Sequence, residues 1–400
     1  MEKIKFGLIG LGNQGTFYAG LFNKGAIENG VLAAVCDIIP QKVDAFMQDE
    51  QNKDVATFID YKEMLDSKIC DVVVVVTPHY FHPEIVTECL NRNINVICDK
   101  PAGVYTKQVR QMNEAAAKSK AKFAMMFNQR TDCRYRKMRE IIKEGGIGDL
   151  QRVTWLMTEW FRTQTYYDSG SWRATWVGEG GGVLFNQCPH QLDLLQWILG
   201  ELPTSVRGFC KYGRWHDIEV EDEVTAYLEF ANGATGVFIT STGEAPGTNR
   251  LEISGTGGKL LSEGPNLYYW KNEEDSYQFS NTSEKSFARP KCEKIEVETD
   301  GQSLGHVGIL NNFANALLGL EDFFVEGTEG INGVELMNAI ELSGWNGGEQ
   351  ISIPVDEDRY YAELQEKNKT SKLKDVDDTR VDNTASSFGV PKAKGGTGLK

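Results

Sequence analysis

The sequence has little positive charge for its length and no long apolar segment. Its 42 lysines and arginines are outnumbered by 57 aspartates and glutamates, so the net charge at pH 7 is −15. That sign repels the phosphates of nucleic acids and of anionic lipids. The longest apolar run, Val72 to Val76, is far shorter than the roughly 20 residues that a membrane helix needs. We therefore expect no nucleic-acid partner and no membrane partner.

The chain also lacks a regular cysteine framework. Its eight cysteines are scattered without a C-x-x-C pair, which favours free thiols in a reducing compartment over a disulfide scaffold. His79 and His82 are two conceivable metal ligands, but no third ligand follows at a spacing typical of zinc sites. A strand pattern begins within the first residues and leaves no room for a signal peptide. These features predict a cytoplasmic protein that binds no metal.

A glycine motif near the start has a specific chemical meaning. An apolar strand pattern runs into Gly10, Gly12 and Gly15, and an amphipathic helix pattern follows directly. In this G-x-G-x-x-G context the glycines permit a tight turn and a close approach of the backbone to a pyrophosphate. A second strand pattern ends at Asp37, where an acid can accept both hydroxyls of an adenosine ribose and repels a 2′-phosphate. The motif therefore predicts NAD as the cofactor.

Strand and helix patterns then alternate as far as about residue 125. Continuous β-branched runs between amphipathic segments indicate a doubly wound α/β domain whose parallel sheet is buried on both faces. Ligands of such sheets lie beyond the carboxyl ends of the strands. The residues that we predict to bind the cofactor follow these strand patterns or belong to the glycine motif: Gly10, Gly12, Asn13, Gln14, Gly15, Asp37, Thr77, Pro78, His79, His82, Asp99, Lys100, Asn128 and Arg130.

Longer strand patterns replace this alternation after about Leu150. Their period of two, with N-G and G-T-G-G turns, indicates an open and mostly antiparallel sheet. Because 400 residues are too many for one ordinary core, we predict several parts. They are a Rossmann dinucleotide-binding domain over 1–125, an α+β substrate-binding and oligomerisation domain over 126–360, and a polar tail over 361–400. The tail is either disordered or an arm on a neighbouring subunit.

Two side chains are candidates for the chemistry of an oxidoreductase. Lys100 follows a buried strand pattern, and its ammonium has three hydrogen-bond donors for a substrate oxygen. His190 lies four residues after Asn186 at the start of a helix pattern. An imidazole can accept a proton because its ordinary pKa of about 6.5 leaves it neutral at working pH. The alternatives are a strand-end lysine that reaches solvent and a structural histidine.

Together these segments resemble the Gfo/Idh/MocA family of oxidoreductases. The resemblance spans roughly residues 4–355 and rests on the glycine motif and on TPHYFH, CDKPAGV, FNQR, EGGIGDLQRV and GEGGGVLFNQCPHQLDLLQWILG. It implies hydride transfer between a secondary ring hydroxyl of a sugar, glycoside or cyclitol and the nicotinamide of NAD. His190 would be the general base, Lys100 would polarise the hydroxyl, and Asn186 would complete the catalytic group. The resemblance also implies a cis peptide before Pro101 and a homo-oligomer, as a dimer, tetramer or larger assembly.

Two positions depart from the family pattern. The family often has a glutamate before the lysine, whereas this chain has the shorter Asp99. The family often has an acid where this chain has Asn186, and an amide supplies no negative charge to stabilise an imidazolium. The departure at Asn186 weakens an inositol-dehydrogenase assignment by analogy and favours a different substrate subset.

The resemblance places a substrate pocket near the segment SWRATW. Indole faces stack on the apolar faces of pyranoses, and Arg173 can donate to hydroxyls or to a carboxylate. Core packing is the alternative for both tryptophans, and Tyr166, Asp168 and His306 are further candidates. The residues that we predict to contact the substrate are Lys100, Tyr167, Trp172, Arg173, Trp176, Asn186 and His190.

Three other functions are compatible with the motifs. One is a redox-neutral glycosidase that oxidises a sugar transiently, and another is a glycoside 3-dehydrogenase whose product passes to a separate lyase. The third is a non-catalytic regulator that binds NAD. The presence of both Lys100 and His190 argues against the regulator, because a sensor needs no base beside the nicotinamide.

Overall fold

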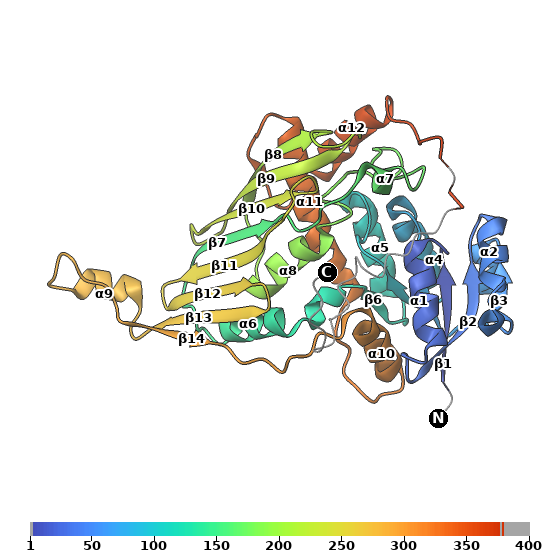
Figure 1. Cartoon of the computed structure of the whole chain (residues 1–400), viewed down its shortest axis with the longest axis horizontal. Helices are drawn as coiled ribbons and strands as arrows, with labels where there is room; N and C mark the ends of the chain where they lie inside the picture. Colours follow the sequence, from blue (N-terminus) through green and yellow to red (C-terminus); the bar gives the residue numbers. More distant parts are fainter. Residues whose placement is uncertain (1–2, 377, 380–400) are drawn as a thin grey trace, which may run out of the picture. The chain divides into compact units, whose positions relative to one another are not determined.

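A computed structural model describes residues 3–376 and 378–379 of the chain (Figure 1). The residues divide into two compact units. The first is built on the chain up to Thr77, and the second runs from Pro78 to Asp378. Residues 377 and 380–400, which include most of the polar tail, lie outside the described part.

The first unit is an α/β structure with parallel strands in the order β3-β2-β1-β4. Each residue of β4 is buried, as its continuous run of valines predicts. The elements are β1 (Ile4–Ile9), α1 (Asn13–Asn23), β2 (Gly30–Cys36), α2 (Pro40–Met47), η1 (Glu50–Asn52), β3 (Ala56–Phe58), α3 (Tyr61–Asp66) and β4 (Val72–Val75).

The second unit opens with further α/β elements. Its first two strands, β5 and β6, also pair in parallel. The elements are η2 (His79–Phe81), α4 (His82–Asn91), β5 (Asn95–Cys98), α5 (Thr106–Lys118), β6 (Phe123–Met125), η3 (Asn128–Thr131) and α6 (Cys133–Lys143).

A nine-stranded sheet follows in the second unit. Its order is β14-β13-β12-β11-β7-β10-β9-β8-β15, and only β7 and β10 pair in parallel. This confirms the mostly antiparallel sheet that the alternating patterns predict. The strands are β7 (Leu150–Met157), β8 (Ser205–Tyr212), β9 (Glu221–Glu229), β10 (Thr235–Ser241), β11 (Asn249–Gly255), β12 (Gly258–Glu263), β13 (Asn266–Asn272), β14 (Cys292–Glu296) and β15 (Ile351–Ser352).

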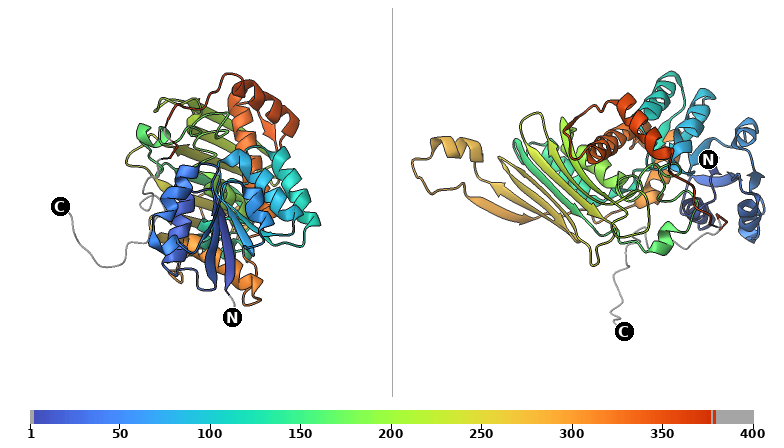
Figure 2. Two further views of the ribbon diagram at one scale, coloured as in Figure 1. Left: turned by 90° about the vertical axis from the view of Figure 1, so that its right-hand side faces the viewer. Right: turned by 90° about the horizontal axis from the view of Figure 1, so that it is seen from above.

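Helices cover one face of this sheet. The helix α8 (Pro189–Leu199) and the helix α11 (Gly330–Trp345) are buried almost all round and lie against it (Figures 1 and 2). By contrast, α9 (Ser276–Thr282) projects beyond the strands with no buried residue. The remaining elements are α7 (Gln164–Tyr167), α10 (Gly305–Leu317), η4 (Gly327–Glu329) and α12 (Glu357–Asn368).

The part of the predicted tail that the structure describes begins within α12 and continues as a polar segment that bonds to a loop of the same chain. The backbone N–H of Lys374 donates to the carbonyl of Ser171 at 2.8 Å, and the hydroxyl of Ser371 accepts from the N–H of Val177 at 3.0 Å. The carboxylate of Asp378 accepts from the N–H of Ser171 at 2.6 Å. Residues 371–376 and 378, which we call the strap, therefore lie along the loop 168–178 of the same chain.

Candidate active site

The glycine motif forms the turn between β1 and α1. Gly10 has a φ of +106°, which L side chains rarely adopt, and a Cβ at Gly15 would lie 1.9 Å from the carbonyl oxygen of Gly10. Gly12, which precedes α1, has open space where a Cβ would stand, with no heavy atom of the described chain within 4 Å, and no side chain caps the helix. The first N–H groups of α1 can therefore donate to the phosphates of a dinucleotide.

Asp37 supports the same turn from the end of β2. Its Oδ2 accepts from the backbone N–H of Leu11 at 2.7 Å, and its Oδ1 accepts from the N–H of Ile39 at 2.9 Å. Each carboxylate oxygen has a further lone pair for a ribose hydroxyl. In addition, Nε2 of Gln14 is buried and has no hydrogen-bond partner within the described chain. The first unit thus has the shape and the polar groups that NAD requires.

Lys100 lies in the second unit, directly after β5. Its Nζ donates to the carbonyl of Asn186 at 2.7 Å, and its backbone N–H donates to Oδ1 of Asp99 at 2.7 Å. The Lys100–Pro101 peptide is cis, and Nδ1 of the buried His82 lies 2.8 Å from the Pro101 carbonyl. Burial lowers the pKa of Lys100, while the negative charges of Asp99 and Glu179 oppose this shift.

His190 is the second residue of α8 and is buried. Burial lowers its pKa well below 6.5, and the positive charge of Lys100 and the neighbouring His306 lower it further. The imidazole is therefore neutral at pH 7. Its Nδ1 has no hydrogen-bond partner within the described residues. The end of β5 and the start of α8 thus bring a cationic donor and a neutral base into one site.

Asn186 contributes its backbone to this site, while its side chain bonds elsewhere. Its Nδ2 donates to the buried carboxylate of Glu179, and its Oδ1 accepts from the hydroxyl of Tyr166 at 3.2 Å. The other oxygen of Glu179 accepts from the N–H of Ala174 at 2.6 Å. Burial raises the pKa of Glu179, and the charge of Arg173 is the largest effect in the opposite direction. Glu179, which sequence analysis missed, can supply the negative charge that Asn186 lacks.

Tyr166 links the substrate-pocket segment to Asn186. Arg173 donates from Nη1 to its hydroxyl at 3.1 Å, and the guanidinium carbon of Arg173 lies 4.7 Å from the ring centroid. The guanidinium carbon of Arg162, which the sequence patterns do not single out, lies 5.1 Å from the same centroid. The rings of Trp172 and His79 pack edge-on, with their centroids 5.5 Å apart. Arg173 and Trp172 are therefore placed close to Lys100 and Asn186.

Two of the residues predicted to contact the substrate belong to the core instead. The ring of Trp176 is buried against Tyr212 and Trp345, with ring centroids 5.8 and 5.6 Å away. Tyr167 is also buried, and its hydroxyl is 2.7 Å from the hydroxyl of Thr242. For both side chains, packing of a large apolar surface decides the position.

Arg130 also differs from its predicted role in binding the cofactor. Its side chain is 1% exposed and forms an ion pair with Asp193 of α8 at 2.6 Å and a second one with Glu329. Both contacts engage the guanidinium, and the ion pair with Asp193 joins η3 to α8, the helix that contains His190. The neighbouring Asn128 lies with its Nδ2 3.5 Å from Nδ1 of His306.

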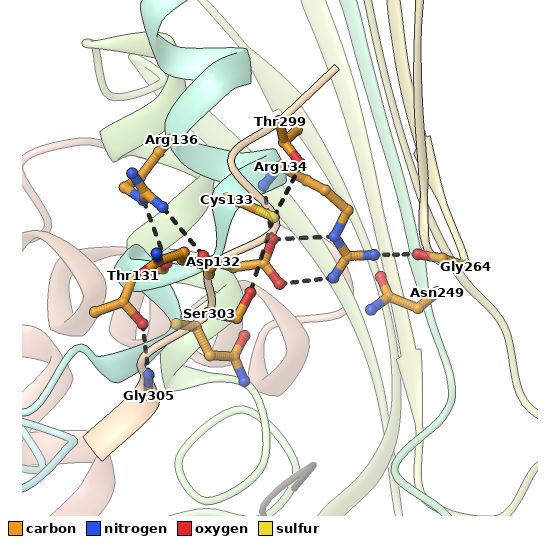
Figure 3. A network of polar contacts seen from close by, with 12 residues as sticks. Thr131, Asp132, Cys133, Arg134, Arg136, Asn249, Gly264, Thr299, Ser303 and Gly305 are labelled. Atoms are coloured by element: carbon orange, nitrogen blue, oxygen red, sulfur yellow. Dashed lines mark hydrogen bonds and ion pairs between the residues drawn. The ribbon is translucent and has the colours of Figure 1, made fainter. Parts of the chain in front are cut away.

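A second polar network lies at the start of α6 (Figure 3). Asp132 caps the helix by accepting from the N–H of Arg134 at 2.9 Å, and it also pairs with the Arg134 guanidinium at 2.7 Å. The hydroxyl of Thr131 accepts from the N–H of Gly305 at 2.7 Å. The network holds the segment that leads into α10 and therefore the position of His306. Among the described residues, no group of three or more acids, histidines or cysteines forms a metal-binding cluster.

The glycine turn and the acid after β2 in the first unit, with Lys100 and His190 in the second, are the features of an NAD-binding oxidoreductase. Comparison with known families agrees with this class. An oxidoreductase family model with an NAD-binding Rossmann fold matches residues 4–127, and the C-terminal domain of the same family matches residues 135–261. The chain therefore belongs to the Gfo/Idh/MocA family, as the motifs indicate.

Individual relatives are distant. The inositol 2-dehydrogenase of Rhizobium meliloti is 25% identical over 65% of this chain and 76% of its own length. The levoglucosan dehydrogenase of Pseudarthrobacter phenanthrenivorans is 26% identical over 50% of this chain and 57% of its own. The crystal structure of the WlbA dehydrogenase from Bordetella pertussis, in complex with NADH and UDP-GlcNAcA, has a TM-score of 0.73 and 25% identity. That match covers 88% of this chain and all of the other.

Proposed function

We propose that the protein is an NAD-dependent dehydrogenase that oxidises a secondary ring hydroxyl of a sugar, glycoside or cyclitol. The observation that carries this proposal is that the Lys100 ammonium bonds to the carbonyl of Asn186, four residues before His190, and that its charge lowers the pKa of the buried His190. The names of the inositol 2-dehydrogenase and of the levoglucosan dehydrogenase support the substrate class.

The two side chains would divide the work on the hydroxyl group. Bound NAD would supply the hydride acceptor. His190 would accept the hydroxyl proton, a role typically worth about 10²- to 10⁴-fold in rate. Lys100 uses one of its donors on the carbonyl of Asn186. Its other donors can reach the substrate oxygen and stabilise the developing alkoxide.

Glu179 would help to keep the amine of Lys100 positively charged. Desolvation favours a neutral Lys100, which could not stabilise an alkoxide. The carboxylate of Glu179, together with Asp99, opposes that shift, and its hydrogen bond from Asn186 holds the residue whose carbonyl orients the lysine. We expect Glu179 to act as a positioning residue rather than as a proton acceptor.

Substitution of the two central residues tests the proposal. We expect Lys100→Ala and His190→Asn each to lower kcat for formation of NADH by about 10²-fold or more, because each removes a group that acts in the transition state. Turnover would be measured with NAD and a panel of hexoses, glycosides and inositols. Lys118→Ala, at the exposed end of α5, is the matched control. Unchanged turnover in Lys100→Ala, with an intact circular dichroism spectrum, would overturn the assigned role.

The same assay separates the other candidate enzymes. Release of an aglycone without net NADH would indicate the redox-neutral glycosidase. A 3-oxo glycoside formed with one equivalent of NADH would indicate the glycoside 3-dehydrogenase that supplies a lyase. NAD binding without turnover of any member of the panel would favour the regulator.

We also infer a cytoplasmic homo-oligomer. No disulfide joins any of the eight cysteines, all of which are described, and this supports a reducing compartment. Within residues 3–376 and 378–379, no helix is long and apolar enough to cross a membrane. Phe209 on β8 is 53% exposed, and burial of its ring against a second subunit would be favourable. Sedimentation analysis would measure the oligomeric state directly.

A further inference from the structure

Two arginines beside the candidate site lack an acidic partner. Arg162 and Arg173 are both half-buried, and their guanidinium groups lie over the ring of Tyr166. Arg173 donates to the Tyr166 hydroxyl, and Arg162 donates to the carbonyl of Phe161 at 2.9 Å. Within the described chain, no carboxylate lies at ion-pair distance from either group. By contrast, Arg130, an arginine outside the site, bonds bidentately to Asp193.

The nearest acid is already committed to other donors. Both oxygens of Glu179 accept hydrogen bonds, one from the N–H of Ala174 and one from Nδ2 of Asn186. Its charge is felt by Arg173, but it makes no ion pair with the guanidinium. Each arginine therefore keeps N–H donors that no acceptor of the described chain takes up.

This positive charge is connected to the reacting groups by a short series of contacts. Arg173 donates to Tyr166 at 3.1 Å, Tyr166 donates to Asn186 at 3.2 Å, and Lys100 donates to the carbonyl of Asn186 at 2.7 Å. Arg162 reaches the same ring of Tyr166. Three cationic groups thus surround Tyr166 and Asn186. At Lys100 the charges of Asp99 and Glu179 are opposed by the positive charges of Arg173 and Arg162, and the open guanidinium donors favour an incoming anion.

We infer that Arg162 and Arg173 bind an anionic substituent of the substrate, so that the substrate is an acidic sugar rather than a neutral one. This inference rests on the proposed function, because it assigns the reacting carbinol to Lys100 and His190. A guanidinium presents a planar fork of donors that matches a carboxylate or a phosphate. A sugar carboxylate and a sugar phosphate share this chemistry. Either would satisfy the open donors while its ring hydroxyl meets the lysine.

Matched substrates test the inference. We expect kcat/KM with NAD to be about tenfold or more higher for glucuronate or glucose 6-phosphate than for glucose, because hydrogen bonds to a charged group are stronger than those between neutral groups. The two anions distinguish a carboxylate from a phosphate. We expect Arg173→Gln and Arg162→Gln to lower the ratio of kcat/KM for the anion to that for glucose, mainly through KM. Lys at either position should restore part of the ratio, and Arg152→Gln on β7 is the control.

A binding measurement keeps this test independent of catalysis. Titration calorimetry of the protein with saturating NAD should show that glucuronate or glucose 6-phosphate binds with an affinity that falls between about 0.05 and 0.5 M NaCl. Binding of either anion without turnover would preserve the inference and overturn the proposed dehydrogenase. Equal kcat/KM for anionic and neutral sugars, with no anion binding, would overturn the inference and leave the dehydrogenase intact. An unchanged ratio in both glutamine variants would also overturn it.

Discussion

At the scale of single residues, the candidate site depends on the charge of Lys100, which two nearby acids offset only in part. Lys100 is buried and remains close to two acids, while His190 is buried next to that lysine. Burial and the adjacent cation both favour a neutral imidazole, and the acids favour a charged amine. In the proposed dehydrogenase, this balance would suit a His190 that accepts the proton and a Lys100 that donates to the hydroxyl.

This arrangement predicts the pH dependence of the enzyme. We expect kcat/KM for oxidation to fall only below pH 6.5, because the lowered pKa of His190 keeps it neutral above that value. The alkaline limb should lie below pH 10.5, since the pKa of Lys100 is also lowered. Glu179→Gln should move the alkaline limb to lower pH, because it removes a charge that raises the lysine pKa.

Profiles of kcat/KM for the wild type and for Glu179→Gln check this prediction. Glu201→Gln, at an exposed turn, is the matched control. An acidic limb at or above pH 6.5 would contradict the assignment of His190. An alkaline limb that does not move in Glu179→Gln would contradict the role of the carboxylate.

At the scale of elements, each reacting group is held by contacts that lie far apart in the chain. His82 at the start of α4 supports the Pro101 carbonyl after β5. The ion pair of Arg130 with Asp193 fixes α8 from η3. Because a displacement of about 1 Å can cost about 10²-fold in rate, such contacts matter as much as the reacting groups.

The strap is the element whose effect is most directly testable. We expect a chain that ends at Thr370 to show a KM at least about threefold higher than the wild type, because the loop 168–178 loses several hydrogen bonds of about 0.5–1.5 kcal/mol each. Among them are the bonds of Lys374 Nζ to the Tyr167 carbonyl at 2.9 Å and of its N–H to Ser171. We expect kcat to change less, because the strap does not contact Lys100 or His190.

A chain that ends at Thr379 is the matched control, since it keeps the strap. Limited trypsin digestion should cleave the shorter chain at Arg173 faster than the control, as expected for a loosened loop. Equal KM and equal cleavage rates for both chains would show that the strap does not position this loop.

At the scale of the whole molecule, a buried pair of acids couples stability to pH. Glu221 on β9 accepts from the N–H groups of Gly182 and Leu184 at 2.7 and 3.0 Å, in the glycine turn before α8. Glu341 on α11 accepts from Nε1 of Trp345 at 3.0 Å. Burial raises the pKa of Glu341 from 4.5 to about 8, although the charge of Lys367 opposes the shift.

The raised pKa of Glu341 determines how the free energy of unfolding changes with pH. Between pH 4.5 and about 8 the folded protein holds a proton on Glu341 that the unfolded chain has lost. This contribution to stability is complete below pH 4.5 and is lost as the pH rises through 8, by up to about 1.4 kcal/mol per pH unit. Glu341→Gln is always neutral, so its free energy of unfolding relative to the wild type should increase over this range.

Urea denaturation at pH 5 and at pH 8 measures this difference. Glu144→Gln, an exposed substitution after α6, is the control and should show no such trend. If the free energy of unfolding of Glu341→Gln differed from that of the wild type by the same amount at pH 5 and at pH 8, a protonated Glu341 would be contradicted.

Parts of the site were predictable from the sequence because they depend on local order. The glycine turn, Asp37, Lys100 and His190 each follow a strand or open a helix, so short-range patterns locate them. Trp176 was harder to interpret because nothing in its neighbourhood in the sequence separates a substrate contact from a core residue. Its partner Trp345 is on α11, which only folding brings near.

The sequence by itself determined the α/β and antiparallel parts, the NAD fingerprint and the family, because hydrophobic periodicity and turn glycines act over a few residues. Only the tertiary structure decided that the carboxyl group of Glu179 bonds to Asn186, that Arg130 is bound within an ion pair, and that Arg162 and Arg173 have no acid of their own among the described residues. The reason is physical: the ion pair of Arg130 joins residues 63 positions apart, and the bond from Lys100 to Asn186 joins residues 86 positions apart. No local pattern specifies which charges meet at such separations.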